Sequence, residues 1–123
     1  MKRFWKDVTL AERGIALDGK PVRTPRRAAL TLPSDALAEA VADEWRGVGD
    51  TVDPRAMPLT GLANAAIDIV AADPPAFAAG LAAYGESDLL CYRAELPAPL
   101  VERQAAAWDP LLDWARGRYD VHF

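Results

Sequence analysis

Histidine, the residue most often used in acid-base catalysis and metal binding, occurs once in this chain, at His122. A Ser-His-Asp triad and a histidine-based metal site both need partners that a single histidine near the chain end does not offer. Cys91 is the only cysteine, so no disulfide within the chain and no zinc site of paired cysteines can form. Gly47 and Gly49 lack the further glycine and the lysine-hydroxyl pair of a phosphate-binding loop. These patterns give no support to catalysis of these kinds or to nucleotide binding.

Carboxylates are the remaining candidates for acid-base chemistry. Glu86, Asp88 and Asp109 would support a small hydrolase or isomerase if two of them shared a concave pocket. Carboxylates are common on helix ends and exposed faces, however, and Asp109 before Pro110 fits a helix cap. Cys91 lies in an apolar run with no histidine nearby, so it is expected to be a small buried side chain and not a nucleophile.

Aromatic and arginine side chains are concentrated in the segments 87–93 and 108–114. Tyrosine, tryptophan and arginine dominate the energetically important positions of protein interfaces. Tyr92, Arg93, Trp108 and Trp114 are therefore the candidate partner-binding residues. Core packing is the alternative for each tryptophan. A contact role predicts that substitution by alanine weakens binding and spares stability, whereas a core role predicts a large loss of stability.

Composition and charge limit the classes of partner. A chain of 123 residues with 51% hydrophobic content is able to form a packed core. No run of about 20 apolar residues could span a bilayer, and the first residues lack the apolar segment of a secretory signal, so a cytoplasmic protein is expected. Residues 1–33 hold 8 Lys/Arg and 3 Asp/Glu, whereas residues 34–123 hold 6 and 15. The larger acidic part is a poor partner for nucleic acid. The asymmetry would orient a protein partner, although a solvated surface also accounts for it.

Alternating polarity over residues 3–32 predicts a small antiparallel sheet. The expected strands lie near residues 4–10, 15–17, 22–24 and 30–32. Asp18-Gly19 supplies the positive backbone angles of a tight hairpin, and Pro21 begins the next strand. Pro25 turns the chain again, because proline donates no hydrogen bond to a central ladder.

Helical periodicity follows from Ser34 onward, so the expected fold class is α+β. Ser34 is a good N-cap for a helix whose apolar stripe ends at Trp45. The proline-rich connector 48–58 is the predicted boundary between a β-rich domain with one helix, 1–57, and a helical domain, 58–123. In that second domain the predicted stripes are Leu62, Ala66, Ile69 and Val70 in one helix and Phe77, Leu81 and Tyr84 in the next. Pro110 either kinks the last helix or starts a new one.

Several short motifs, taken in order, resemble the assembly chaperones for the alpha subunit of F-type ATP synthase, the assembly factor 2 family of that complex. The motifs are Asp18-Gly19-Lys20-Pro21-Val22-Arg23-Thr24-Pro25, Leu32-Pro33, Glu44-Trp45, Met57-Pro58-Leu59-Thr60, Ala66-Ile67-Asp68, the segment 87–93, Gln104 and the segment 108–114. Each motif alone is weak, but together they cover nearly the whole chain. The resemblance implies a β-rich N-terminal domain followed by an all-helical C-terminal domain, in agreement with the periodicity.

The resemblance also implies a function without catalysis, cofactor or small-molecule substrate. Members of the family bind newly made alpha subunit and cover the surface destined for the beta subunit until the two assemble. Lys20 and Gly61 stand where arginine is more usual in the family, and Gly61 removes one potential partner contact. Family chains continue beyond the position of Phe123, so the helical domain is expected to be truncated here, with Leu111, Leu112 and Trp114 exposed.

Three hypotheses follow. The first is an ATP-independent chaperone for the alpha subunit of ATP synthase, with neither nucleic-acid binding nor membrane insertion. The second is the carboxylate-dependent enzyme, which requires Glu86, Asp88 and Asp109 to converge. The third is a structural module that associates with itself through its helical face, which light scattering at varied concentration separates from a monomeric chaperone.

Overall fold

Two tight hairpins build the sheet at the N-terminus of the protein, whose computed structural model describes all residues from 1 to 123. β1 (Val8–Ala11) pairs antiparallel with β2 (Gly14–Leu17), and β3 (Lys20–Pro21) pairs antiparallel with the other side of β2. The fold class predicted from the sequence, α+β with a small antiparallel sheet preceding the helices, is confirmed.

The Asp18-Gly19 hairpin between β2 and β3 is confirmed. Both residues adopt positive φ, 49° and 83°, as a two-residue turn of this kind requires. The Asp18 carboxylate accepts hydrogen bonds from the backbone N–H groups of Asp7, at 2.8 Å, and Lys6, at 3.0 Å. These bonds, from Asp7 first and then Lys6, hold the pKa of Asp18 below its usual value, because they favour the charged carboxylate. The turn is therefore tied to the chain that leads into β1.

The hairpin between β1 and β2 differs from the sequence prediction. Its turn residues, Glu12 and Arg13, have φ of 52° and 61°, an uncommon conformation for residues other than glycine. Neither of these two positions holds the glycine or asparagine that would mark such a turn in the sequence. The expected strand over 4–10 was therefore placed too early, since β1 begins at Val8 and ends at Ala11. The segments 22–24 and 30–32, expected to be strands, contribute only isolated bridges, Arg23 with Ala29 and Gly14 with Thr31.

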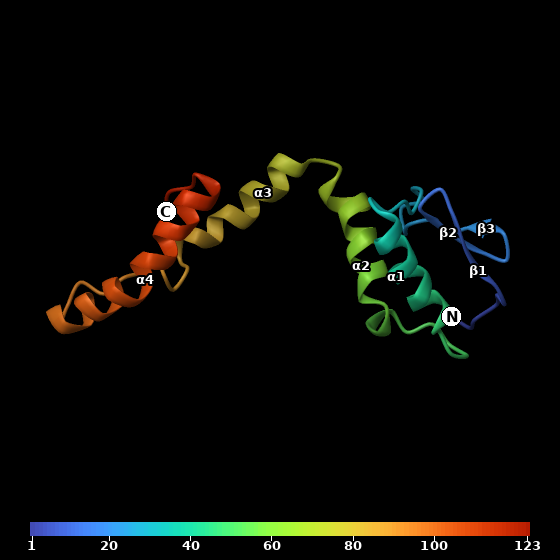
Figure 1. Ribbon diagram of the computed structural model, residues 1–123, viewed down its shortest axis with the longest axis horizontal. Helices are drawn as coiled ribbons and strands as arrows, with labels where there is room; N and C mark the ends of the chain where they lie inside the picture. The colour runs from blue at the N-terminus through green and yellow to red at the C-terminus, as the bar shows by residue number, and fades with distance from the viewer. The chain divides into compact units, whose positions relative to one another are not determined.

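The helix α1 (Asp35–Arg46) covers the sheet and shares its core. Ser34 is the N-cap, as predicted: its Oγ accepts from the N–H of Leu37 at 3.2 Å. α1 contacts β1 and β2 on one side and α2 (Pro58–Ala65) on the other, and Figure 1 shows α2, α1 and the sheet in that order. The buried core consists of Trp5, Ile15, Leu17, Leu30, Leu32, Ala38, Val41, Ala42, Val48 and Met57.

The helix α2 continues into a π-helical turn, η2 (Ala66–Val70), and buries a different face from the predicted one. Leu59, Ala63 and Ile67 pack against the core. Leu62 and Ile69, members of the predicted stripe, are 69% and 52% exposed, so that prediction is wrong. Apolar residues surround this helix on most sides, and periodicity alone therefore did not identify the side that faces α1.

The chain forms two compact units, Met1–Pro74 (unit 1) and Pro75–Phe123 (unit 2). The connector after α1 contains a 3-10 turn, η1 (Pro54–Ala56), which Asp53 caps. The predicted boundary at 57–58 lies inside unit 1, because α2 packs against α1. The division of the protein into domains at that boundary stays a prediction.

The rest of the chain is helical and lacks a buried core. It contains α3 (Pro74–Ala82), a 3-10 turn η3 (Ala83–Glu86) and α4 (Ala98–Tyr119). No residue after Thr60 is fully buried. The predicted buried face of Phe77, Leu81 and Tyr84 is exposed, because no other element packs extensively on α3.

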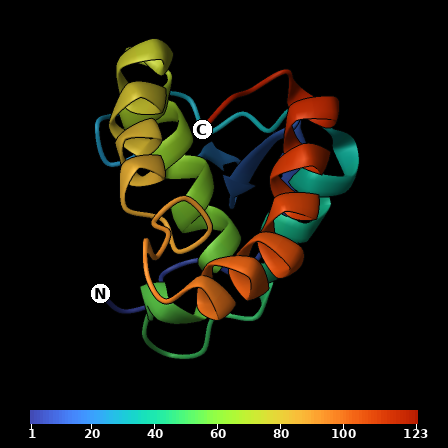
Figure 2. The same ribbon diagram turned by 90° about the vertical axis from the view of Figure 1, so that its left-hand side faces the viewer.

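Pro110 lies inside α4, which runs as one continuous helix (Figures 1 and 2). The alternative of a new helix starting at Pro110 is therefore wrong. Proline has no N–H, so the carbonyl of Ala106 lacks its usual helical partner. Across the whole chain, no single helix is long and apolar enough to cross a membrane, although the two consecutive helical segments Pro58–Val70 and Pro74–Glu86 reach that length and composition together.

Candidate partner-binding site

Asp88 folds the segment 87–93 into a tight turn beside α4. Its carboxylate accepts from the N–H of Leu90 at 2.9 Å, and its carbonyl accepts from the N–H of Tyr92 at 2.8 Å. The N–H of Ala94 then donates to Oε1 of Gln104 at 2.8 Å, which attaches the end of the turn to α4. The side chain of Tyr92 points outward from this turn and is 75% exposed.

Arg93 fastens the same turn to α4 through its guanidinium. The guanidinium donates to the carbonyl of Leu90 and, at 2.9 Å, to the carboxylate of Asp109. It also lies over the ring of Trp108, 5.3 Å from the ring centre, where the electron-rich face attracts a cation. The Arg93 side chain is only 26% exposed, and its Nη2 is buried without a hydrogen-bond partner. Arg93 and Trp108 therefore have a structural role in holding the turn.

An exposed aromatic group occupies the last turns of α4. Trp114 is 61% exposed and meets Tyr119 edge to face, with ring centres 5.7 Å apart. The guanidinium of Arg118 lies 4.9 Å from the centre of the Tyr119 ring. Leu111, one helical turn before Trp114, is also exposed, whereas Leu112 is half-buried. Apolar side chains that remain open to solvent at neighbouring helical positions are typical of interaction surfaces.

The four residues predicted to bind a partner thus fall into two pairs. Arg93 and Trp108 contact each other and are engaged within unit 2, whereas Tyr92 and Trp114 are available to a partner. A binding role for any of the four stays a prediction. Sequence reasoning assigned Asp109 to a helix cap or to acid-base chemistry, but it lies inside α4 and pairs with Arg93. The 16-residue separation of that pair gave no local signal.

The carboxylates of the alternative enzyme do not form an enclosed site. Glu86, Asp88 and Asp109 are all exposed, and Asp88 closes the turn while Asp109 pairs with an arginine. His122 accepts a hydrogen bond at Nδ1 from Arg116 at 3.3 Å. No group of three or more histidine, cysteine, aspartate or glutamate residues is placed to hold a metal ion. The exposure of the three carboxylates counts against shared acid-base chemistry.

Two acidic motif residues in unit 1 have structural roles. The Glu44 carboxylate accepts from the backbone N–H groups of Leu59, at 3.0 Å, and Thr60, at 2.8 Å, and so caps the start of α2 from α1. The Asp68 carboxylate in η2 accepts from the buried hydroxyl of Thr24 at 2.6 Å. These bonds attach α2 and η2 to the rest of unit 1. The motifs that contain them are therefore important for the fold of this unit.

A family model and several solved structures match this chain, and they agree with one another. The model of the ATP12 chaperone protein family matches residues 2–116. The crystal structure of Atp12 from Paracoccus denitrificans superimposes with a TM-score of 0.79 at 49% sequence identity, covering 94% of this chain and 51% of that one. The Atu1473 protein from Agrobacterium tumefaciens gives a TM-score of 0.74 at 48% identity, covering 94% of this chain and 45% of that one. The chain thus spans about half the length of the proteins it matches.

Proposed function

Because the chain belongs to the ATP12 chaperone protein family, we propose that it is an ATP-independent assembly chaperone that binds the free alpha subunit of ATP synthase. It covers the surface of the alpha subunit that later meets the beta subunit, and it releases the alpha subunit when the two assemble. It acts in the cytoplasm, without catalysis and without a cofactor.

Membership of the ATP12 chaperone protein family is the observation that supports this proposal, and the exposed apolar surface of unit 2 is compatible with it. No residue after Thr60 is fully buried, and large side chains such as Tyr92, Leu111 and Trp114 are more than half exposed. Burial of apolar surface contributes about 25 cal/mol for each Å² removed from water. A client that exposes its own subunit interface would gain that stabilisation at unit 2 without any covalent step.

Suppression of aggregation tests the proposal. Isolated alpha subunit should remain soluble in the presence of this protein without ATP, as measured by light scattering at a wavelength where neither protein absorbs. Trp114→Ala should reduce the protection, because it removes an exposed aromatic anchor. Arg103→Ala is the matched control, since Arg103 is an exposed residue of the same helix. Absence of protection at several-fold molar excess would contradict the proposal.

Partner choice is tested separately by affinity capture with purified subunits. The immobilised protein should retain alpha subunit and leave beta subunit in solution. Equal recovery of both subunits would indicate nonspecific apolar binding and not the proposed role. Light scattering of the protein alone, at several concentrations, distinguishes a monomeric chaperone from a structural module that associates with itself.

A further inference from the structure

A hollow of about 310 Å³ lies in unit 1, beside the sheet. Its walls are β2 and the two segments 21–23 and 29–31. Each segment pairs with β2: Pro21 with Ala16, and Thr31 with Gly14. The N–H of Val22 donates to the carbonyl of Ile15 at 2.8 Å, and the N–H of Leu32 donates to the carbonyl of Arg13 at 2.9 Å. A bridge between Arg23 and Ala29 closes the far end. Backbone held in place by these hydrogen bonds thus borders the hollow, which is open to solvent on one side.

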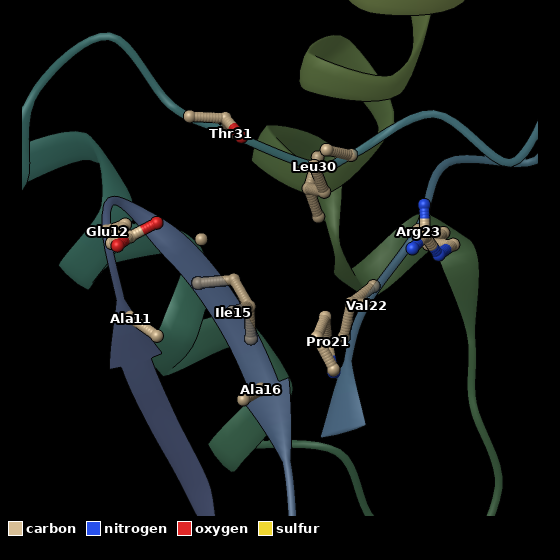
Figure 3. A pocket seen from close by; sticks show the side chains of 11 residues that line it. Ala11, Glu12, Ile15, Ala16, Pro21, Val22, Arg23, Leu30 and Thr31 are labelled. Atoms are coloured by element: carbon tan, nitrogen blue, oxygen red, sulfur yellow. The ribbon is translucent and has the colours of Figure 1, made fainter. Parts of the chain in front are cut away.

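The lining of the hollow is mostly apolar, and five of its residues are small. Ala11, Gly14, Ala16, Pro21 and Ala29 contribute little side-chain volume, so nothing from this chain fills the space. Figure 3 shows Glu12 at one end of the hollow and Arg23 at the other. Ile15 and Leu30 belong to the buried core and are 1% and 2% exposed, so the open space is bordered mainly by the small residues. An apolar cavity of about 150 Å³ is enough to hold benzene. The space therefore accommodates one large apolar side chain together with some of the backbone that carries it.

The charge beside the hollow is strongly positive at the Arg23 end. Residues 19–33 contain Lys20, Arg23, Arg26 and Arg27 and no aspartate or glutamate. Arg26 is engaged, because its guanidinium donates to the carbonyl of Asp68 at 2.8 Å. Arg23 makes a single long contact, 3.4 Å to the carbonyl of Arg27, and it remains exposed. Its guanidinium is free to bind a carboxylate, the group whose geometry it matches best.

Addition of a strand from a partner is an unsuitable mode of binding at this edge of the sheet. β3 is only two residues long, and its second residue, Pro21, has no N–H to donate. Recognition at this place must therefore come from side chains entering the hollow and from charge, and not from a continued ladder of backbone hydrogen bonds.

We infer that this hollow is a docking socket for an acidic, extended segment of a partner protein. An apolar side chain of that segment occupies the space bordered by Gly14 and Ala29, and a neighbouring carboxylate pairs with Arg23. Glu12 at the opposite end disfavours a second carboxylate there, so the bound segment has one orientation. The inference rests on the proposed function only in that the partner is a protein.

Binding of a designed peptide tests the socket. The probe is a pentapeptide with a central leucine, glutamates on one side of it and alanines on the other, acetylated and amidated at its ends. It is made in two versions, with the glutamates before or after the leucine, and each is added to the 15N-labelled full chain. Amide resonances of residues 11–16 and 21–31 should shift on titration. A peptide with glycine in place of leucine, and one with lysines in place of the glutamates, should cause much smaller shifts.

Three variants make the test specific. Ala29→Leu fills the hollow at an exposed position and should weaken binding about tenfold or more, since a leucine side chain loses its burial site. Arg23→Gln should weaken binding about two- to fivefold, the range of an exposed ion pair. Arg55→Gln, which removes another exposed cation outside the hollow, should leave the affinity unchanged. Thermal unfolding checks that each variant is folded.

Several results would overturn the inference. They are equal binding of the glycine peptide, unchanged binding to a folded Ala29→Leu variant, and shifts confined to unit 2. Displacement of the peptide by oligothymidylate, with no effect of Ala29→Leu, would identify a general anion surface instead of a peptide socket. The aggregation assay is run in parallel. Protection of alpha subunit without peptide binding defeats the socket alone, whereas peptide binding without protection defeats the proposed chaperone function alone.

Discussion

Glu44 caps α2 from a neighbouring helix, and Glu44→Ala should therefore destabilise unit 1. Met57, the residue before α2, provides no side-chain hydrogen bond to the helix start. The Glu44 carboxylate instead accepts from the N–H groups of Leu59 and Thr60, at 3.0 and 2.8 Å. Amides at this position have no partner within their own helix. The Thr60 hydroxyl, in a side chain that is 6% exposed, also lies 3.3 Å from the same carboxylate.

The expected loss follows from these contacts. Removing a cap costs about 1 kcal/mol, and removing a negative charge near a helix N-terminus costs about a further 0.5 kcal/mol. Loss of the hydrogen bond from the buried Thr60 hydroxyl to Glu44 costs roughly 1 kcal/mol more. The free energy of unfolding should fall by about 2.5 kcal/mol. With a urea m-value of about 1.5 kcal/mol/M for a unit of this size, the midpoint should fall by about 1.7 M.

Urea unfolding followed by far-UV circular dichroism measures this loss. Glu44→Gln keeps one acceptor oxygen and should lose about 1 kcal/mol, because it removes the charge and spares part of the cap. Glu39→Ala is the matched control: Glu39 lies in the same helix and makes an exposed ion pair with Arg46, which contributes at most about 1 kcal/mol. Equal midpoints for Glu44→Ala and Glu39→Ala would refute the capping argument.

Four further predictions concern the turn chemistry, the acid response and the candidate site. Gly19→Ala should lower the free energy of unfolding by about 1 kcal/mol, because Gly19 has φ of 83°. Gly49→Ala is the control and should not lower it, because Gly49 has open space around it and no positive φ. Thermal unfolding compares the two variants. The pKa of Asp18 is lower in the folded state than in the unfolded state. Its stabilisation is therefore complete above about pH 4 and is lost as the pH falls through the folded pKa, so Asp18→Asn should flatten the acid side of a stability curve measured by urea unfolding. Arg93→Ala should lower the stability of unit 2 by about 2 kcal/mol, because it breaks the contacts of the turn with α4. Trp114→Ala should change stability by less than about 0.5 kcal/mol and weaken client binding, as calorimetry would show.

Local sequence signals identified the features of this protein that depend on a few neighbouring residues. The Asp18-Gly19 hairpin follows from the backbone freedom of its residues, and the start of α1 follows from the Ser34 hydroxyl that binds Leu37 N–H. The order of sheet and helices, and so the α+β class, follows from the change of apolar period at Ser34. The single histidine and the single cysteine likewise limit the chemistry open to the chain, because residue counts do not depend on how the chain folds.

Tertiary structure decided everything that depends on residues distant in the sequence. Glu44 caps a helix that begins 14 residues later, a pairing that no local pattern indicates. The face that α2 buries was set by α1, because apolar residues surround α2 on most sides. The sequence does not distinguish Arg93 and Trp108 from Tyr92 and Trp114, because all four are of residue types that are common in binding sites. Only the contacts of Arg93 with Asp109 and Trp108 separate the structural pair from the exposed pair, because side-chain exposure is a property of packing and not of residue type.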